Sequence, residues 1–334
     1  MSGSFPLTVT GVMALAVASL AIAAPASTMK AIRYESYGPA SVLQLRDVPT
    51  PVAAAGEVLV RVDAAGVNPI DWKLRHGRGN AAAPPEAVTP GFDIAGRVAA
   101  LGAGVTGYEA GDAVFALLHR QAGYAEYVTV PAGDLVRTPA NIDAAHAAAI
   151  PTAAQTAWES LFDEGGLKAG QTVLIHGAAG GVGHFAVQLA KHAGARVIGT
   201  ASAANAEFLK SIGADQVIDY KSEKFEELAK NVDLVLDTIG GDTLARSYGV
   251  VNKGGTIVTI VTRLDAAKMA EHGLRMPAEG GSGSPLPKIA ELVARGAVKP
   301  EVGATYPLAD AQKAHEQSET GHARGKIVLL VPGS

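Results

Sequence analysis

Residues 172–192 read TVLIHGAAGGVGHFAVQLAKH, which places a short apolar strand, a glycine-rich turn and a helix in direct succession. Glycines at 177, 180 and 183 keep a three-residue spacing, and Ala179 stands in the register of the usual second glycine. Such a turn lets backbone N–H groups and the positive end of the helix dipole approach a pyrophosphate. The sequence therefore predicts dinucleotide binding, and the alternative is an ordinary tight turn between a strand and a helix. The predicted contacts are Gly177, Ala178, Ala179, Gly180, Gly181, Val182 and Gly183.

Strands and helices alternate regularly around this turn. After the first strand, at 172–176, further apolar strands are predicted at 196–200, 216–219, 234–238 and 256–260. Helices are predicted between them, at 184–192, 204–212, 223–230 and 243–250. Strands that are apolar on both faces indicate a parallel sheet covered by helices on both sides. We therefore expect a Rossmann nucleotide-binding domain over residues 147–284.

The flanking sequence has a different pattern, in which Gly and Pro separate short predicted strands. Strands are predicted at 29–34, 43–47, 58–65, 92–101, 113–118 and 125–130. A helix is predicted at 288–295, and a last strand at 326–331 returns to the β-rich character of the first part. The predicted fold class is α/β: a Rossmann parallel-sheet domain, and a β-rich domain built from residues 29–146 and 285–334.

Composition excludes several classes of protein. The chain has 334 residues, enough for two buried cores, and 48% apolar against 18% charged residues excludes intrinsic disorder. The balance of 28 basic and 32 acidic residues gives a net charge of −4. This charge gives no indication of the excess of basic residues that is typical of proteins that bind nucleic acid. The absence of cysteine excludes disulfides, thiolate zinc sites, iron–sulfur clusters and cysteine nucleophiles.

The first 28 residues are set apart from the fold. Residues 7–24 form an uncharged run rich in Ala, Val and Leu, followed by Ala24-Pro25-Ala26, which is typical of an export signal cleaved after Ala26. However, no Lys or Arg precedes the run, and its length is near the lower limit for an uncleaved membrane anchor. The other alternative is translation from Met29. We expect an exported or anchored protein if the segment is a true signal, and a cytoplasmic one otherwise.

The residues after the second Rossmann strand indicate which dinucleotide binds. NAD sites usually place an acidic residue there to accept hydrogen bonds from the ribose 2′-hydroxyl. This chain has no acid before Glu207, whereas Ser202 and Asn205 can donate hydrogen bonds to a 2′-phosphate. The pattern favours NADP. Lys210 and Lys221 are the candidates for a neighbouring cation, and the alternative for both is a solvated surface lysine.

Motifs along the whole chain after the leader resemble the medium-chain dehydrogenase/reductase superfamily, and in particular its zinc-independent, zeta-crystallin-like quinone oxidoreductase branch. In order, these motifs are KAIRYESYG from residue 30, AAGVNPIDWK at 64–73, PGFDIAG at 90–96, GDAV at 111–114, GYAEYV at 123–128, the turn at 177–183, GADQVIDY at 213–220 and GKIV at 325–328. The resemblance implies that the β-rich domain is GroES-like and that the active site lies between the two domains. It also implies a homodimer.

The resemblance bears directly on metal binding. Asn68, Phe92 and Thr152 match the Cys, His and Cys positions that hold catalytic zinc in other members, and none of them is a competent zinc ligand in such a set. We therefore expect no metal. Hydride transfer without a Lewis acid favours an acceptor that is reactive by itself, either a quinone or a carbonyl conjugated to an alkene.

Several site residues follow from the same resemblance. Asn68 is expected beside the nicotinamide, although it could be only a capping residue before Pro69. Thr156 is expected to contact nicotinamide or phosphate, and Tyr220 is expected on the adenine side. The backbone of Ile239 and Gly240 should line the cleft, and Lys326 resembles a segment that folds over the cofactor, with surface charge as the alternative.

Four further polar residues are candidates for direct roles in catalysis. Asp71 and Lys73 could orient the site or relay a proton, and an ordinary salt bridge is the alternative. Tyr37 and Tyr124 could donate hydrogen bonds to the substrate, or serve only as structural phenols.

Together these features predict an NADPH-dependent, metal-independent reductase of small quinones or enones. Two alternatives stay open: a non-catalytic NADPH-binding protein, and an enone or enoyl reductase with little activity on quinones. Membrane association is expected only if the N-terminal segment is an uncleaved anchor.

Overall fold

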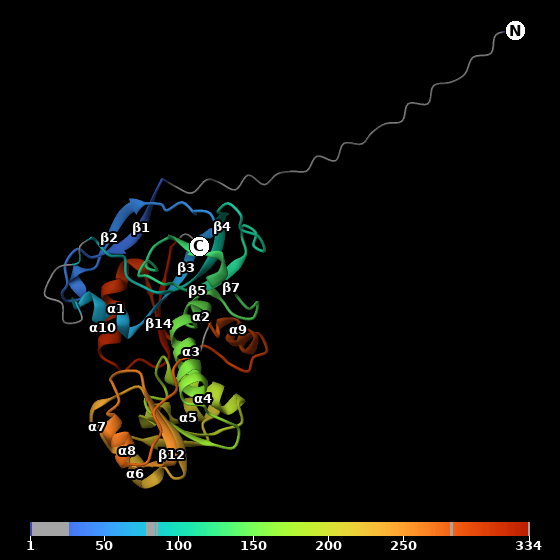
Figure 1. The fold of residues 1–334 in the computed structure, drawn as a ribbon. Helices are drawn as coiled ribbons and strands as arrows, with labels where there is room; N and C mark the ends of the chain where they lie inside the picture. Colours follow the sequence, from blue (N-terminus) through green and yellow to red (C-terminus); the bar gives the residue numbers. More distant parts are fainter. Residues whose placement is uncertain (2–26, 78–83, 85, 281–282, 333–334) are drawn as a thin grey trace.

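The computed structural model describes Met1 and residues 27–77, 84, 86–280 and 283–332, which form two lobes (Figure 1). The upper lobe of Figure 1 holds the β-rich domain, and the lower lobe holds the Rossmann domain. Of the predicted export or anchor segment, residues 1–28, residues 2–26 lie outside the described residues, and Thr28 is already the first residue of a strand. Within the described part of the chain, no helix has the length and apolar character needed to cross a bilayer.

Five parallel strands build the lower lobe, in the order β10-β9-β8-β11-β12. Their bounds are β8 (Thr172–Ile175), β9 (Arg196–Ala201), β10 (Gln216–Asp219), β11 (Val232–Asp237) and β12 (Val251–Thr259). Successive residues of β8 face opposite sides: Val173 belongs to one apolar cluster and Leu174 to another. The winding direction reverses between β8 and β11, and open sheets of this kind bind ligands at such a reversal.

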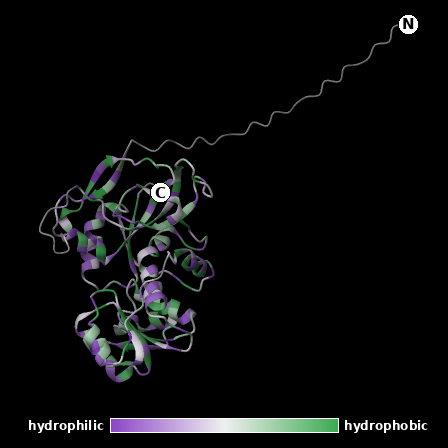
Figure 2. Cartoon of the chain, viewed as in Figure 1, coloured by the Kyte–Doolittle hydropathy of each residue, from purple (hydrophilic) through white to green (hydrophobic). Residues whose placement is uncertain are grey.

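Short helices follow these strands and cover the two faces. They are α4 (Gly183–His192), α5 (Ala206–Ser211), α6 (Phe225–Leu228), α7 (Gly241–Ser247) and α8 (Ala266–Glu271). Figure 2 shows the hydrophobic residues along the strands inside both lobes, where they form the cores.

The upper lobe contains a seven-stranded sheet and a separate hairpin. The strands of the sheet are β3 (Glu57–Val67), β4 (Asp93–Leu101), β5 (Ala113–Leu117), β6 (Tyr127–Pro131), β7 (Val136–Arg137), β13 (Val302–Pro307) and β14 (Lys326–Leu330). The hairpin pairs β1 (Thr28–Arg33) with β2 (Gln44–Pro49). β3 is flanked by β14 on one side and β4 on the other, so that Ile327 pairs with Val67 while Asp93 pairs with Gly66. The start of the C-terminal strand therefore lies beside the end of β3.

Five helices support or join the two sheets: α1 (Pro69–Arg75), α2 (Ala144–Ala148), α3 (Pro151–Trp158), α9 (Leu286–Ala294) and α10 (Ala311–Glu319). A π-helical turn at Glu159–Glu164 continues α3. Single 3-10 turns lie at Ala40–Val42, Ala132–Asp134, Ala203–Asn205 and Leu308–Asp310. In Figure 1, α3 runs from the upper lobe into the lower one, and its buried alanines belong to an apolar cluster shared by both lobes.

The predicted α/β fold class is confirmed, and the predicted Rossmann strands recur with their ends shifted by a few residues. Sequence patterns did not predict α1, α10 or β13. α10 reads AQKAHEQSE, and only Ala311, Ala314 and His315 are buried, so its apolar periodicity is too weak to mark a helix.

Candidate active site

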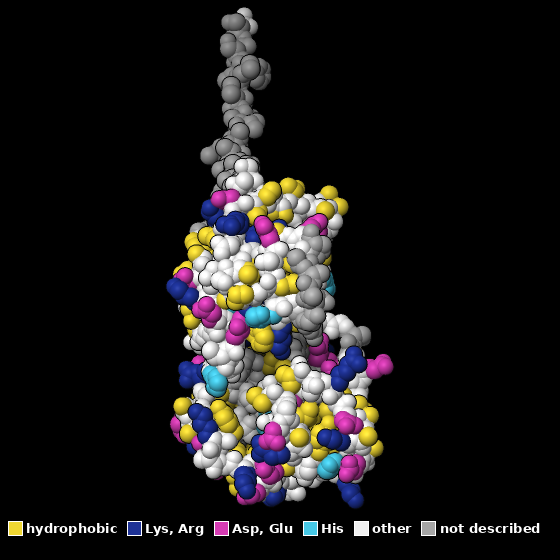
Figure 3. All heavy atoms as spheres, turned by 90° about the vertical axis from the view of Figure 1, so that its left-hand side faces the viewer, with side chains coloured by type: hydrophobic (Ala, Val, Ile, Leu, Met, Phe, Trp, Pro, Cys, Tyr) yellow, Lys and Arg dark blue, Asp and Glu magenta, His cyan; other side chains and the backbone are white. Residues whose placement is uncertain are grey.

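A cleft of about 770 Å³ lies between the two lobes and receives side chains from both. Its walls come from the junction of β3 and α1, the start of α3, the glycine-rich turn, the carboxyl ends of the Rossmann strands and the start of β14. Figure 3 shows the molecule from the side, with a hollow where the lobes meet. The structure brings most of the predicted site residues to this cleft: Asn68, Lys73, Thr156, Gly177, Ala179, Gly180, Gly181, Val182, Gly183, Ser202, Asn205, Tyr220, Ile239 and Lys326.

The glycine-rich turn closes one wall of the cleft and leads directly into α4. Gly177 has a φ of +64°, and a Cβ there would lie 2.4 Å from the Thr238 hydroxyl oxygen. A Cβ on Gly183 would lie 2.3 Å from the carbonyl oxygen of Gly177, so glycine allows the helix to start close to the strand. The N-terminus of α4 thereby presents free backbone N–H groups to the cleft, an arrangement that fits a pyrophosphate.

Two buried histidines support this turn, and sequence reasoning missed both. His184 Nε2 accepts a hydrogen bond from the Glu301 N–H at 3.1 Å, so Nδ1 carries the proton and donates to the Gly180 carbonyl at 2.9 Å. His176 bridges the hydroxyl groups of Thr200 and Ser247, each at 3.0 Å. Burial lowers the pKa of both imidazoles to about 4, so near pH 7 they hold the turn as neutral groups and add no charge.

The loop after β11 forms the neighbouring wall. Buried Asp237 accepts hydrogen bonds from the backbone N–H groups of Ile239 at 3.0 Å and Gly240 at 2.9 Å. Ile239 is thereby held with its side chain exposed in the cleft, whereas Gly240 does not line it. Ala178 also lies outside the lining, because it is buried and its N–H donates to the Thr200 carbonyl at 3.0 Å.

The far end of the cleft carries the residues predicted to bind the 2′-phosphate. Ser202 and Asn205 lie together after β9, with 3.3 Å between the Asn205 amide nitrogen and the Ser202 hydroxyl oxygen. Exposed Tyr220 follows β10 on the same wall. The two cation candidates do not line the cleft: Lys210 forms an exposed ion pair with Glu207, and Lys221 also lies outside the lining.

Arg246 lines the cleft instead, and no sequence pattern predicted it. Its guanidinium forms ion pairs with Glu226 and Asp242, both at 2.9 Å, and lies 4.8 Å from the centre of the Phe225 ring. Two carboxylates therefore already neutralise this cation.

The opposite end of the cleft is built around Asn68, the last residue before α1. Its side-chain amide nitrogen donates to Asp93 at 2.9 Å, and its amide oxygen accepts from the Lys326 ammonium. Lys326 also donates to the Val67 carbonyl at 3.0 Å, and Asp93 accepts from the Thr152 backbone N–H at 3.0 Å and from its hydroxyl. Lys326 is thus a buried ammonium at the Asn68 end of the cleft, while Asp93 is a partner that sequence reasoning missed.

Three of the predicted catalytic residues lie outside the cleft lining. Asp71 and Tyr124 are completely buried, and the Tyr124 hydroxyl donates to Asp71 at 2.9 Å, while His315 Nε2 lies 3.3 Å from the same hydroxyl. Asp71 also accepts from the Asn68 backbone N–H at 2.8 Å. Tyr37 lies against Tyr34, with 6.5 Å between ring centres, and does not line the cleft either. Asp71 and Tyr124 point into the domain, where their hydrogen-bond partners lie. They can therefore affect the cleft only indirectly, by holding α1 in place.

Burial is the main cause of the pKa shifts of Asp71, Tyr124 and His315. It raises the pKa of Asp71 to about 7, raises the pKa of Tyr124 well above its usual value, and lowers the pKa of His315 to about 3. Lys73 is different, because it lines the cleft with its ammonium 5.5 Å from the centre of the Trp72 ring.

The donor set at the Asn68 end does not fit zinc. Phe92 has no ligand atom, the Thr152 hydroxyl donates to Asp93, and an ammonium occupies the amide oxygen of Asn68. Within the described residues, no group of three or more His, Asp or Glu side chains is arranged to hold a metal ion.

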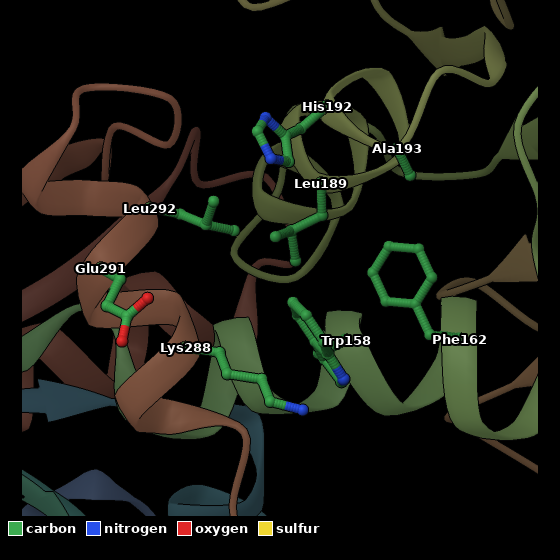
Figure 4. Close-up of a pocket in the computed structure, with 8 residues that line it drawn as sticks. All are labelled: Trp158, Phe162, Leu189, His192, Ala193, Lys288, Glu291 and Leu292. Atoms are coloured by element: carbon green, nitrogen blue, oxygen red, sulfur yellow. The ribbon is translucent and has the colours of Figure 1, made fainter.

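A second, smaller hollow of about 290 Å³ lies at the other end of α4 (Figure 4). Its walls are Trp158, Phe162, Leu189, His192, Ala193, Lys288, Glu291 and Leu292. None of these residues lines the cleft, and none belongs to the predicted site.

The chain matches two known protein families and many of their members. Residues 54–140 match the family model of the alcohol dehydrogenase GroES-like domain, and residues 212–329 match the model described as zinc-binding dehydrogenase. The chain is 36% identical over 329 residues to a 2-methylene-furan-3-one reductase from Solanum lycopersicum, covering 95% of this chain and 82% of that protein. It is 35% identical to a chloroplastic NADPH-dependent alkenal/one oxidoreductase from Arabidopsis thaliana, covering 90% and 79%.

Solved structures give the same picture. The quinone oxidoreductase from Coxiella burnetii superposes with a TM-score of 0.80 at 36% identity, covering 91% of this chain and 99% of that one. A mycobacterial protein complexed with NADPH superposes with a TM-score of 0.80 at 31% identity, covering 90% and 100%.

Proposed function

The chain belongs to the medium-chain dehydrogenase/reductase superfamily, in its quinone oxidoreductase branch, and we propose that it reduces quinones or α,β-unsaturated carbonyl compounds with NADPH and without a metal ion. It is an NADPH-dependent reductase, as its relatives indicate. The observation that carries the proposal is the cleft itself. One wall is the helix N-terminus suited to a pyrophosphate, and the facing wall carries Asn68 and Lys73.

Different residues of the cleft bind different parts of the cofactor and of the acceptor. Backbone N–H groups at the start of α4 fit the cofactor pyrophosphate, while Ser202 and Asn205 can donate hydrogen bonds to the 2′-phosphate. Bound NADPH supplies the hydride. On the facing wall, Asn68 and Lys73 can donate hydrogen bonds to an oxygen of the acceptor, where negative charge collects as the hydride adds.

The substrate class follows from the donor set at the Asn68 end. Because that set does not suit zinc, stabilisation of the developing charge falls to hydrogen-bond donors of the protein. Acceptors that already delocalise charge, such as quinones and enones, need less help than simple ketones. Ile70, Ile260 and Val261 line the cleft with apolar surface, which suits such acceptors.

NADPH oxidation by the purified chain tests the proposal, with a simple benzoquinone and a 2-alkenal compared side by side and a saturated ketone as the control. We expect turnover of the conjugated acceptors and none of the ketone, with no change after treatment with EDTA. Turnover of the alkenal with little activity on the quinone would identify an enone reductase. Tight NADPH binding without turnover of any acceptor would contradict the proposal and indicate a non-catalytic NADPH-binding protein.

The place where the protein acts depends on residues 1–26. Relatives include proteins described as chloroplastic and mitochondrial. N-terminal sequencing of the protein from its native host distinguishes a removed leader from a retained anchor and from a start at Met29.

A further inference from the structure

The side-chain amide of Asn68 is held between two buried residues of opposite charge. Asn68 is 3% exposed, Asp93 is fully buried and Lys326 is 3% exposed. Asp93 comes from β4 and Lys326 from β14, the two strands that flank β3. The amide nitrogen donates to Asp93 and the amide oxygen accepts from Lys326, so the two neighbouring strands hold opposite ends of one carboxamide.

These two partners permit one orientation of the amide. A carboxylate accepts hydrogen bonds and cannot donate them when ionised, and an ammonium donates and cannot accept. Rotation of the amide by 180° would direct its N–H groups at the ammonium and its oxygen at the carboxylate, which exchanges two attractive contacts for two repulsive ones. The amide of Asn68 is therefore fixed, with one of its two N–H groups used by Asp93 and the other left over.

Asp93 and Lys326 have anchors of their own. Asp93 accepts from the backbone N–H of Thr152 at the start of α3, and Lys326 donates to the Val67 carbonyl. The Lys326 ammonium lies 3.6 Å from Asp93, so the pair compensates its own charge inside the domain. A buried ion pair adds little stability compared with apolar residues, and its best-attested use is to specify one arrangement.

Lys326 also touches the nucleotide side of the cleft. A Cβ on Gly181 would lie 3.2 Å from Lys326 Cδ, and the preceding residue, Gly325, donates its N–H to the Ala179 carbonyl at 2.8 Å. The aliphatic part of Lys326 thus lies against the glycine-rich turn, while its charge points away from that turn to Asn68.

On the basis of the proposed function, we propose that Asp93 and Lys326 are positioning residues that hold the Asn68 amide so that its free N–H is directed at the oxygen of the acceptor substrate. When hydride adds to the conjugated system, the displaced electron pair moves to this oxygen, and water supplies the proton that completes the reduction. The ammonium on the amide oxygen draws electron density from the amide and strengthens the remaining N–H as a donor. Lys326 therefore acts through Asn68 and makes no phosphate contact.

A double-mutant cycle with Asn68→Ala and Lys326→Met tests this assignment, with kcat for a 2-alkenal and the Kd of NADPH measured separately. We expect Lys326→Met to lower kcat by about 10²-fold in the wild-type background, the usual cost of losing or misplacing one such donor. In the Asn68→Ala background it should lower kcat by less than about 3-fold, because the group through which it acts is gone. The Kd of NADPH should change by less than about 3-fold in both backgrounds.

Lys313→Met is the matched control, since Lys313 is an exposed lysine that pairs with Asp310 on the surface of α10. Lys326→Met leaves Asp93 without its counter-charge and could unfold the domain. In that case, the pair Asp93→Asn with Lys326→Met, which removes both charges, is compared with and without Asn68→Ala.

Three results separate the possibilities. Equal losses of kcat in the two Asn68 backgrounds would overturn the positioning role. A large rise in the Kd of NADPH with kcat little changed would also overturn it and assign Lys326 to the cofactor phosphates. Absence of turnover by the wild-type chain would instead overturn the proposed function, and this inference with it.

Discussion

Asp71→Asn should stabilise the protein, and the gain should grow with pH. Asp71 is fully buried, and burial raises the pKa of its carboxyl from 3.8 to about 7 in the folded state. Between these two pH values, the folded state keeps a proton on Asp71 that the unfolded state has lost. Because the folded state binds more protons, the free energy of unfolding falls as pH rises from about 4 to 7 and is constant above that. Asparagine does not titrate, so the variant escapes this loss.

The size of the effect follows from the two pKa values. Each unit of difference corresponds to about 1.4 kcal/mol, so ionised Asp71 costs the folded state about 4 kcal/mol above pH 7 and less than about 2 kcal/mol at pH 5. The stability gained by the variant should therefore increase by about 2–3 kcal/mol between pH 5 and pH 8. The amide oxygen of asparagine can accept from both the Asn68 backbone N–H and the Tyr124 hydroxyl. Its NH2 group takes the place of Oδ1, which is buried without a hydrogen-bond partner among the described residues, so it lowers the gain by the same amount at every pH and leaves the increase with pH unchanged.

Urea denaturation of both proteins at pH 5, 6, 7 and 8 measures this difference directly. Asp47→Asn is the control, because Asp47 forms an exposed ion pair with Lys30 on the β1–β2 hairpin and should give a gain near zero at every pH. A stability difference between wild type and Asp71→Asn that stays constant from pH 5 to pH 8 would refute the reasoning, because it would mean that Asp71 has the same pKa in the folded and unfolded states.

Three other expectations concern the cofactor and the metal. Gly183→Ala places a methyl group 2.3 Å from the Gly177 carbonyl oxygen, so the start of α4 must move by about 1 Å. In thermal melts the free energy of unfolding should fall by about 1–3 kcal/mol, and in fluorescence titrations the Kd of NADPH should rise about tenfold. Gly133→Ala, where the added methyl group meets open space, should change neither quantity. Ser202→Asp adds a carboxylate where the 2′-phosphate is expected, and should weaken NADPH binding by tenfold or more while NADH binding improves; unchanged ratios of the two Kd values would argue against this phosphate site. Dialysis against EDTA should leave kcat unchanged, and a loss that added zinc restores would contradict a metal-independent reaction.

The sequence was most informative where contacts are local. The strand, turn and helix of residues 172–192 follow one another in the chain, and each is marked by its own residue types, so the Rossmann core could be predicted from short-range patterns. The absence of an acid after β9 was equally readable and agrees with the NADPH dependence of the relatives.

Long-range partners could not be predicted in the same way. Asn68 and Lys326 are 258 positions apart, and only the pairing of β14 with β3 brings them together. The sequence offered Lys326 as a cofactor ligand, but a lysine does not reveal which way its ammonium points. The same holds for Tyr124. The sequence predicted that its hydroxyl could donate to the substrate, but the hydroxyl points into the domain and donates to Asp71.

The position of β14 has a consequence for how the chain matures during translation. This strand lies inside the sheet of the upper lobe, between β13 and β3, and it brings Lys326 to the cleft. β6 can pair with the first half of β3 early, but Ala64–Val67 of β3 must stay unpaired while the ribosome makes the whole lower lobe. The Asn68 end of the cleft therefore forms only after residues 326–330 have emerged. A bulky fusion attached directly after this strand should therefore lower kcat more than the same fusion placed at the N-terminus.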